Sequence, residues 1–585
     1  MAKRPAAGSE TSLEYKLTDI PPVHLCFIFG LQQVLLSISS TISIPLVVSR
    51  YVCADHLDLV TAEIMATFLF MCGVCTLLQD LLGVRLPILQ GGCHKFLPAI
   101  AALMSLDVWK CPPKELMKSV WNGTEADAVD LNVTLYDDTE VWQARMREIQ
   151  GGIMLASLVQ VAIGCTGILG FLLNYLGPLT IIPCITLVGL SLVNVALNFC
   201  ASQLGIAALT VCLIFVFSLY LGNIKPPLPA WSRKEGLHII NYPVFKLFSV
   251  ILTVIIAWGL CAILTSYDVF LPTGPEKMAR TDAKQHVLQQ SRWFFFPYPG
   301  QWGMPTISSA SFAAMLAATI TSIIESVGDY YACARISDVP PPPAHAVNRG
   351  IFIEGVGSLL SGAVGSGGAT TSYSQNVGAI GFTRVASRAV FVTAGLIFLV
   401  SGVLGKLGAF LTMIPDPVLG GVLLVGFGLV TSVGLSNMQF VNMTSSRNLT
   451  IIGSAMLIGL MVPEYLHKYP DVINTGNSEF DQAIKVLLST SMFVGGALGF
   501  ILDNTVPGSD EERGILKWRA QVELTCEDDT GTPTDISTYD LPLIMPCLKK
   551  LACSRYIPCL PGFNVRPPKI PSAYCRKKRK ANINP

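Results

Sequence analysis

Runs of about 20 apolar residues recur along this chain, and they constrain its fold more than any other feature. About 20 residues of α-helix cross the ~30 Å hydrocarbon core of a bilayer. Only 14% of the residues are charged, against about 25% in soluble proteins. The chain is therefore predicted to be an all-α polytopic membrane protein. The runs lie near 22–49, 60–82, 151–171, 174–197, 203–222, 243–266, 310–336, 389–411, 418–435, 447–463 and 484–503.

Three further segments, near 88–105, 349–365 and 372–383, are short or interrupted by glycine. Counting them gives about fourteen transmembrane segments, in two blocks of about seven. An odd number of spans makes the two blocks inverted repeats. The third segment of each block is glycine-rich, so the third and tenth spans are expected to be short and broken. Paired interrupted segments point to the binding site of a transporter; the alternative is glycine for close helix packing.

Basic residues in the short loops predict the orientation of the spans. With the N-terminus inside, these residues fall on the cytoplasmic side, as the positive-inside rule requires. We therefore expect a plasma-membrane protein with both termini in the cytoplasm. The expected parts are a tail at 1–21, a first repeat at 22–266, an extracellular loop at 267–305, a second repeat at 306–503 and a tail at 504–585.

The loop at 106–148 is expected to lie outside the cell. It carries sequons at Asn122 and Asn132, which we expect to be glycosylated. Cys53 and Cys111 flank external loops and can form a disulfide.

Several classes of function have no support in the sequence. The formal net charge of +1 favours neither a nucleic-acid partner nor a substrate held by bulk charge. The sequence contains no nucleophile elbow, metal-ligand cluster or phosphate loop, so we expect neither an enzyme nor a cofactor. Transport, with the lipid bilayer as the surrounding solvent, is the remaining class.

Two carboxylates lie inside the span at 310–336. Glu325 and Asp329 are four residues apart and therefore share one helix face. A carboxylate in mid-membrane costs about 2.5–3.5 kcal/mol, so such residues face protein, water or a cation. They can accept hydrogen bonds from the ring N–H groups of a heterocycle, bind sodium or relay a proton. They can also pair with a basic residue of another span, of which Lys95 is the main candidate.

A second polar group, Ser374-Gln375-Asn376, begins the short segment of the second block. A glutamine amide offers both a donor and an acceptor. This matches the alternating N–H and C=O edge of uracil, xanthine or hypoxanthine. The amide can also cap broken backbone, and both roles can hold together.

The string from Gln375 to Arg388 resembles the signature of the nucleobase–ascorbate transporter family. Supporting matches, which extend the resemblance to about residues 20–520, are Gly30-Leu-Gln-Gln33, Glu325-Ser-Val-Gly-Asp329, Pro415-Asp-Pro417 and Ile501-Leu-Asp-Asn-Thr-Val-Pro-Gly508. The resemblance implies a core domain from spans 1–4 and 8–11 and a gate domain from spans 5–7 and 12–14. It also implies a homodimer with gate contacts and an elevator-like movement of the core.

The resemblance implies roles for individual residues. Glu325 matches the substrate-binding glutamate, Gln375 a second substrate contact, and Ser374 and Asn376 flank it. Asp329 matches the sodium position of animal members. Glutamine at 375, where ascorbate carriers usually have proline, favours nucleobases. The expected function is sodium-coupled symport of uracil, thymine, guanine, hypoxanthine or xanthine. The alternatives are ascorbate transport by the same fold, and a transport-inactive sensor or channel-like member.

Two departures from the family pattern concern the site itself. Gln33 replaces a histidine, although its oxygen can still ligate sodium. Cys93-His94-Lys95 replaces a small residue, an aromatic residue and an alanine. Cys93 and His94 then line the expected substrate site, with His94 at the ring-stacking position. Lys95 either lies close to Glu325 and occupies it, or points toward the cytoplasmic side or solvent.

Overall fold

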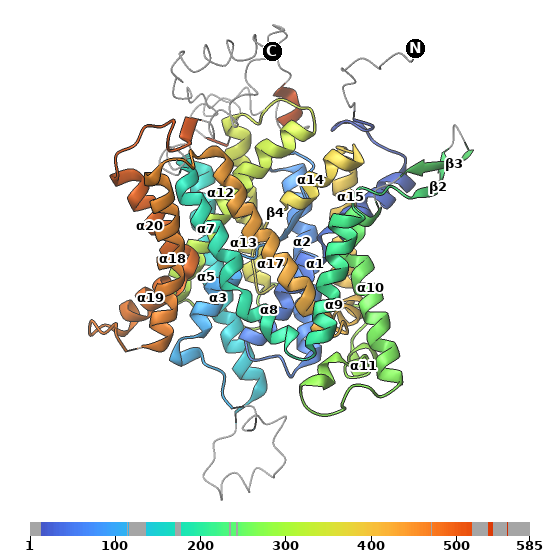
Figure 1. Cartoon of the computed structure of the whole chain (residues 1–585), viewed down its shortest axis with the longest axis horizontal. Coiled ribbons are helices and arrows are strands. Elements are labelled where there is room, and N and C mark those ends of the chain that lie inside the picture. The colour runs from blue at the N-terminus through green and yellow to red at the C-terminus, as the bar shows by residue number, and fades with distance from the viewer. Residues whose placement is uncertain are drawn as a thin grey trace, which may run out of the picture.

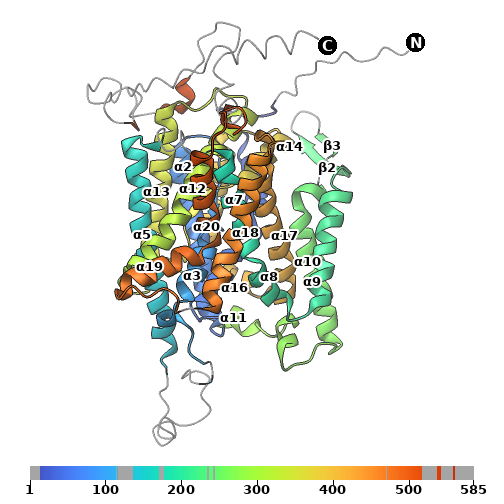
Figure 2. The ribbon, with the colours of Figure 1, turned by 60° about the vertical axis from the view of Figure 1, so that its left-hand side comes forward.

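The fold is a bundle of helices that run in roughly one direction (Figures 1 and 2). The computed structural model describes residues 13–113, 115, 136–169, 177–232, 236–241, 244–469, 471–516, 536–541 and 558–559. The sequons at Asn122 and Asn132 lie outside these residues. The helices up to residue 266 are α1 (Val23–Tyr51), α2 (Asp58–Leu81), α3 (Phe96–Met104), α5 (Asp138–Thr166), α7 (Pro178–Ser191), α8 (Val193–Cys200), α9 (Leu204–Phe215) and α10 (Val244–Ser266).

The helices after residue 266 complete the bundle. They are α11 (Gln285–Gln290), α12 (Ser309–Ile336), α13 (Ala344–Val364), α14 (Ser374–Thr383), α15 (Arg388–Val403), α16 (Gly405–Thr412), α17 (Asp416–Ser436), α18 (Ser446–Lys468), α19 (Ser478–Ser489) and α20 (Ser491–Thr505). Strands β2 (Pro227–Ser232) and β3 (Gly236–Asn241) form a hairpin at the end of the bundle opposite to α11 (Figures 1 and 2).

Seven helical stretches in the described residues are long and apolar enough to cross a membrane, and two bent pairs raise the number to nine. A mostly helical membrane protein is thereby confirmed, while the fourteen spans and the inverted repeats stay predictions. The seven stretches are Asp58–Leu81, Asp138–Thr166, Pro178–Cys200, Val244–Ser266, Ser309–Ile336, Asp416–Phe440 and Ser446–Lys468.

Two glycine-rich segments are interrupted helices. Strand β1 (Gln90–Gly92) precedes α3, and strand β4 (Thr370–Ser372) precedes α14. The strands pair antiparallel, with Gln90 opposite Ser372 and Gly92 opposite Thr370. From this pair, α3 extends toward the end of the bundle with α11, and α14 toward the end with β2 and β3 (Figures 1 and 2). Two half-helices therefore begin near one point inside the bundle.

The third segment with interrupting glycines, near 349–365, is different. It belongs to α13, which is a continuous helix of 21 residues. A Cβ on Gly355 would lie 2.9 Å from the backbone nitrogen of Val161 on α5. The glycines here allow two helices to pack closely, which corrects the expectation of a broken segment.

The helices pack as two groups. One group contains α1, α2, α3, α5, α12, α13, α14 and α15, and the other contains α7, α8, α9, α10, α17, α18 and α20. Helix α19 contacts members of both. At the end of the bundle near α11, Arg50 of α1 donates to Asp416 of α17 at 2.6 Å and so links the groups.

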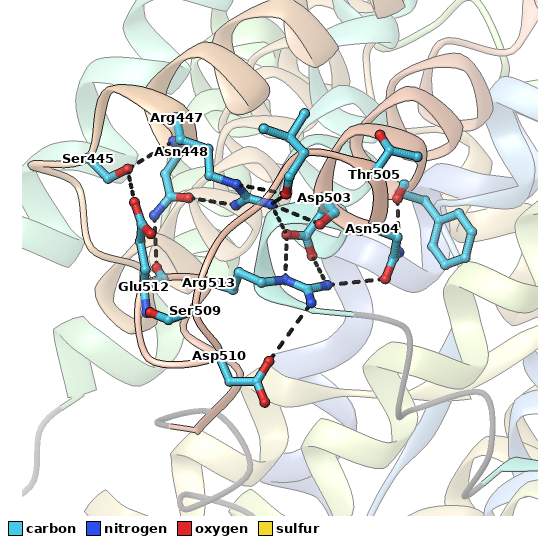
Figure 3. A network of polar contacts seen from close by, with 12 residues as sticks. Ser445, Arg447, Asn448, Asp503, Asn504, Thr505, Ser509, Asp510, Glu512 and Arg513 are labelled. Atoms are coloured by element: carbon cyan, nitrogen blue, oxygen red, sulfur yellow. Dashed lines mark hydrogen bonds and ion pairs between the residues drawn. The ribbon is translucent and has the colours of Figure 1, made fainter.

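Covalent and ionic links hold the segments outside the spans. A disulfide joins Cys53 to Cys111, the pair expected from the sequence. Asp503 of α20 is buried between two guanidinium groups, Arg447 of α18 at 3.2 Å and Arg513 at 2.9 Å (Figure 3). These ion pairs fix the segment after α20 against the second group of helices.

Candidate functional site

The candidate site lies where the β1–β4 pair meets α12. Helices α3 and α14 both begin there, and a helix N-terminus carries a partial positive charge and free N–H groups. Helix α12 passes alongside and contacts α3, α14 and β4. Its two carboxylates, Glu325 and Asp329, are therefore presented to the starts of both half-helices.

Glu325 forms an ion pair with Lys95, which immediately precedes α3. Of the two positions left open for Lys95, the structure has the one on Glu325. Lys95 is 4% exposed, whereas the Glu325 side chain is 20% exposed. The pair joins Glu325 Oε2 to Lys95 Nζ. Glu325 Oε1 has no hydrogen-bond donor among the described residues.

Asp329 is held by hydroxyl groups. Its two carboxylate oxygens accept hydrogen bonds from Ser374 Oγ at 2.7 Å and Ser372 Oγ at 2.8 Å. Ser372 ends β4 and Ser374 begins α14, so the strand–helix junction positions both donors. Asp329 thus has hard oxygen atoms around it, which is the donor type that sodium-like cations prefer.

Gln375 and Asn376 have opposite surroundings although they are neighbours. The Gln375 side chain is exposed on the first turn of α14. Asn376 is buried, and its Nδ2 donates to Gln33 Oε1 at 2.8 Å and to the Gln33 carbonyl at 2.9 Å. Asn376 therefore fixes α14 to α1, and the amide oxygen of Gln33 is directed at Asn376.

His94 and Cys93 complete the departures from the family pattern. His94 Nε2 lies 3.0 Å from Ser43 Oγ, and its ring meets Phe427 edge to face with centroids 6.0 Å apart. The imidazole is thus packed between α1 and α17. Cys93 is buried, and its backbone N–H donates to Ala369 at 3.1 Å, which extends the β1–β4 pairing.

A further carboxylate, Glu354 of α13, lies behind the site. It accepts hydrogen bonds from Ser326 Oγ at 2.7 Å and from the Tyr330 hydroxyl at 2.9 Å. Gln79 Nε2 donates to the same tyrosine hydroxyl at 2.7 Å. This network joins α2, α12 and α13. Its one signal in the sequence is an acidic residue within an apolar, glycine-rich segment.

No group of three or more His, Cys, Asp or Glu side chains that could hold a metal ion occurs among the described residues. A cation at Asp329 would therefore depend on hydroxyl and backbone oxygens beside that single carboxylate. The fit to a tightly bound transition metal is poor, and the fit to a weakly held alkali cation is better.

Comparison with known proteins decides the family. The model of a permease family matches residues 25–468. Solute carrier family 23 member 1 of Rattus norvegicus is 43% identical over 552 residues, which are 94% of this chain and 89% of that protein. Nucleobase-ascorbate transporter 11 of Arabidopsis thaliana is 30% identical over 587 residues, covering 92% of this chain and 76% of that protein. The chain belongs to the nucleobase–ascorbate transporter family.

A solved structure supports the same architecture for this nucleobase–ascorbate transporter family member. The murine anion transporter Slc26a9 in its inward-facing state superimposes with a TM-score of 0.50 at 15% identity. The match covers 86% of this chain and 73% of that one. Sequence, family and fold together identify a multi-pass membrane protein from a family of transporters, not of enzymes.

Proposed function

We propose that this protein is a sodium-coupled symporter of nucleobases such as uracil, thymine, guanine, hypoxanthine and xanthine. The observation that carries the proposal is the position of Glu325 at the starts of both half-helices, with Oε1 open. A carboxylate there accepts from a ring N–H, and the exposed Gln375 amide on α14 offers a donor and an acceptor to the same ring edge. The family match supports a small-molecule substrate.

The coupling ion is proposed to bind at Asp329. Its carboxylate and the hydroxyl oxygens of Ser372 and Ser374 would hold the ion, which would add a positive charge beside the substrate. Gln33 stays a proposed ligand, although Asn376 engages its side-chain oxygen. The substrate contacts assigned to His94, Cys93, Ser374 and Asn376 are likewise proposals.

The proposed movement is an elevator-like displacement of one helix group against the other. The packing of the helices into two groups, with the site on the α1–α3 and α12–α14 side, supports it. Residues Gly328, Gln375 and Gly381 are exposed, which supports the proposal that the site opens toward the end where α14 lies. We take that end as cytoplasmic, with both termini there. Plasma-membrane location, homodimerisation and glycosylation at Asn122 and Asn132 are part of the same proposal.

A second candidate is a member that does not transport and acts as a sensor or channel. The Lys95–Glu325 ion pair favours it, because a protein cation occupies part of the carboxylate that a base would use. Ascorbate transport by the same fold is a third candidate. Among the features of the described site, none favours ascorbate, and Gln375 favours nucleobases instead.

Uptake in oocytes separates these candidates. Labelled uracil, hypoxanthine and ascorbate are offered with sodium or with choline in its place. The proposal predicts saturable uptake of the bases that depends on sodium. Accumulation of ascorbate without the bases would overturn the nucleobase assignment, and a sodium current that does not saturate with base would favour the channel.

A further inference from the structure

Lys95 is a buried cation with more donors than protein partners. An ammonium group carries three N–H donors and no acceptor. In the described part of the chain its partner is Glu325, and the residue is only 4% exposed. Leaving N–H donors of a charged group buried without acceptors is costly. The open donors therefore favour a bound molecule that brings an oxygen acceptor.

The charges around Lys95 favour an acceptor that is itself negative. Glu325 alone would repel an anion, but the ion pair is neutral as a unit. Helices α3 and α14 both direct their positive ends at the site. With a sodium ion at Asp329, two cations would face two carboxylates, and the helix ends would leave the site attractive to an anion.

The Lys95–Glu325 ion pair places a hydrogen-bond acceptor, Glu325 Oε1, beside a donor, the Lys95 ammonium group. Glu325 Oε1 can accept from a ring N–H, and Lys95 can donate to an oxygen on the neighbouring ring atom. A neutral base offers a carbonyl oxygen there. An ionised base offers an oxygen with a negative charge, and hydrogen bonds between charged groups are about twice as strong as those between neutral groups.

We propose that Lys95 makes the site selective for the anionic form of weakly acidic heterocycles. The preferred ligand has a ring N–H beside an oxygen that carries the negative charge. This inference rests on the proposed function, since it concerns the same site and the same class of ring. Lys95 is then the residue that determines charge specificity.

Equilibrium binding of two pyrimidines with similar outlines tests the inference. Thymine is neutral at neutral pH, and 5-nitrouracil is largely ionised there. Each labelled base is titrated onto the full-length protein in detergent with sodium present. We expect 5-nitrouracil to bind at least about tenfold more tightly, which corresponds to about 1.4 kcal/mol.

The variant K95M keeps the length of the side chain and removes its charge. We expect it to reverse the order, with thymine bound more tightly than 5-nitrouracil. K110M is the matched control, because Lys110 also pairs with a carboxylate, that of Asp107, but on the surface. The ratio of the affinities for 5-nitrouracil and thymine in K110M should equal the ratio in the wild type. If K95M does not fold, the double variant K95M/E325Q removes both charges and should bind the two bases within about threefold of each other.

The possible results distinguish failure of the charge selectivity from failure of nucleobase binding. Tighter binding of thymine by the wild type overturns the inference and leaves nucleobase binding intact. An unchanged ratio in K95M, or a ratio above tenfold in the double variant, also overturns it. If the wild type binds neither base, the proposed function falls and the inference falls with it.

Discussion

The Glu325 carboxylate has two oxygens, and the protein itself uses one of them. Oε2 pairs with Lys95, and Oε1 is the proposed acceptor for a ring N–H. We expect Glu325→Ala to weaken the binding of labelled uracil by at least about tenfold, because a hydrogen bond to a charged group contributes about 1.5–3 kcal/mol and Lys95 is left without its partner. Glu464→Ala is the control, since Glu464 is exposed on α18. Unchanged uracil binding in Glu325→Ala would remove Glu325 from the site.

The role of the Asp329 charge in sodium binding can be tested separately. In Asp329→Asn the carbonyl oxygen can still accept from a serine, but the negative charge is lost. We expect the sodium concentration for half-maximal uptake to rise about tenfold or more, with base affinity at saturating sodium changed less. Asp471→Asn, at an exposed position, should leave both values unchanged. A variant with the wild-type sodium curve would place the ion elsewhere.

The residue pattern predicted one part of this site and missed another. Glu325 and Asp329 could be predicted because their spacing and their cost in a membrane are local properties. The sequence left two positions for Lys95, and the packing of α3 against α12 decides between them. Glu354 was missed although it is an acidic residue in an apolar, glycine-rich segment; its partners Ser326 and Tyr330 come from another helix and could not be predicted.

Among the elements, the β1–β4 pair depends on glycine where side chains of α1 and α2 pack against β1. A Cβ on Gly92 would lie 2.4 Å from Ile44 Cδ1 and 2.5 Å from Phe68 Cζ. We therefore expect Gly92→Ala to destabilise the protein by about 1–3 kcal/mol and to lower its melting temperature in detergent. Gly259→Ala is the matched control, because nothing lies within 4 Å of a Cβ at that position in α10. Equal melting temperatures for the two variants would show that a Cβ at position 92 causes no steric conflict.

Glycine content alone did not distinguish the two kinds of glycine-rich segment. Strands β1 and β4 have extended backbone, and they contain the polar residues Gln90 and Ser372. In α13 two of the glycines face α5, where Gly355 lies against Val161 and Gly362 against Met154. The helical period is unbroken in α13, and only the packing partner explains its glycines.

In the whole molecule, Arg50 is one of the described residues that join the two helix groups. Arg50 makes two contacts with the second group. It donates to Asp416 at 2.6 Å, and its guanidinium lies 3.3 Å from the ring centroid of Phe199 on α8. Lys284 also donates to Asp416 at 3.0 Å. Lys284 directly precedes α11, and α11 lies at the end of the bundle opposite to α14 (Figures 1 and 2).

If the groups slide past each other during transport, the Arg50–Asp416 pair must break in every cycle. It then stabilises the state described here, which we propose to be open toward α14. The Arg50 side chain is 30% exposed, so its pair contributes only about 1 kcal/mol. Arg50→Gln should therefore shift the equilibrium about fivefold toward the opposite state.

Maleimide labelling of Gln375→Cys can report this shift, measured as the gain over the same protein without that substitution. We expect Arg50→Gln to lower the labelling rate by up to about fivefold, because residue 375 spends less time open to solvent. Arg447→Gln is the control: Arg447 holds the buried Asp503 within the second group and does not join the groups (Figure 3). A labelling rate that Arg50→Gln leaves unchanged, in a protein that still takes up base, would show that this contact does not change during the cycle.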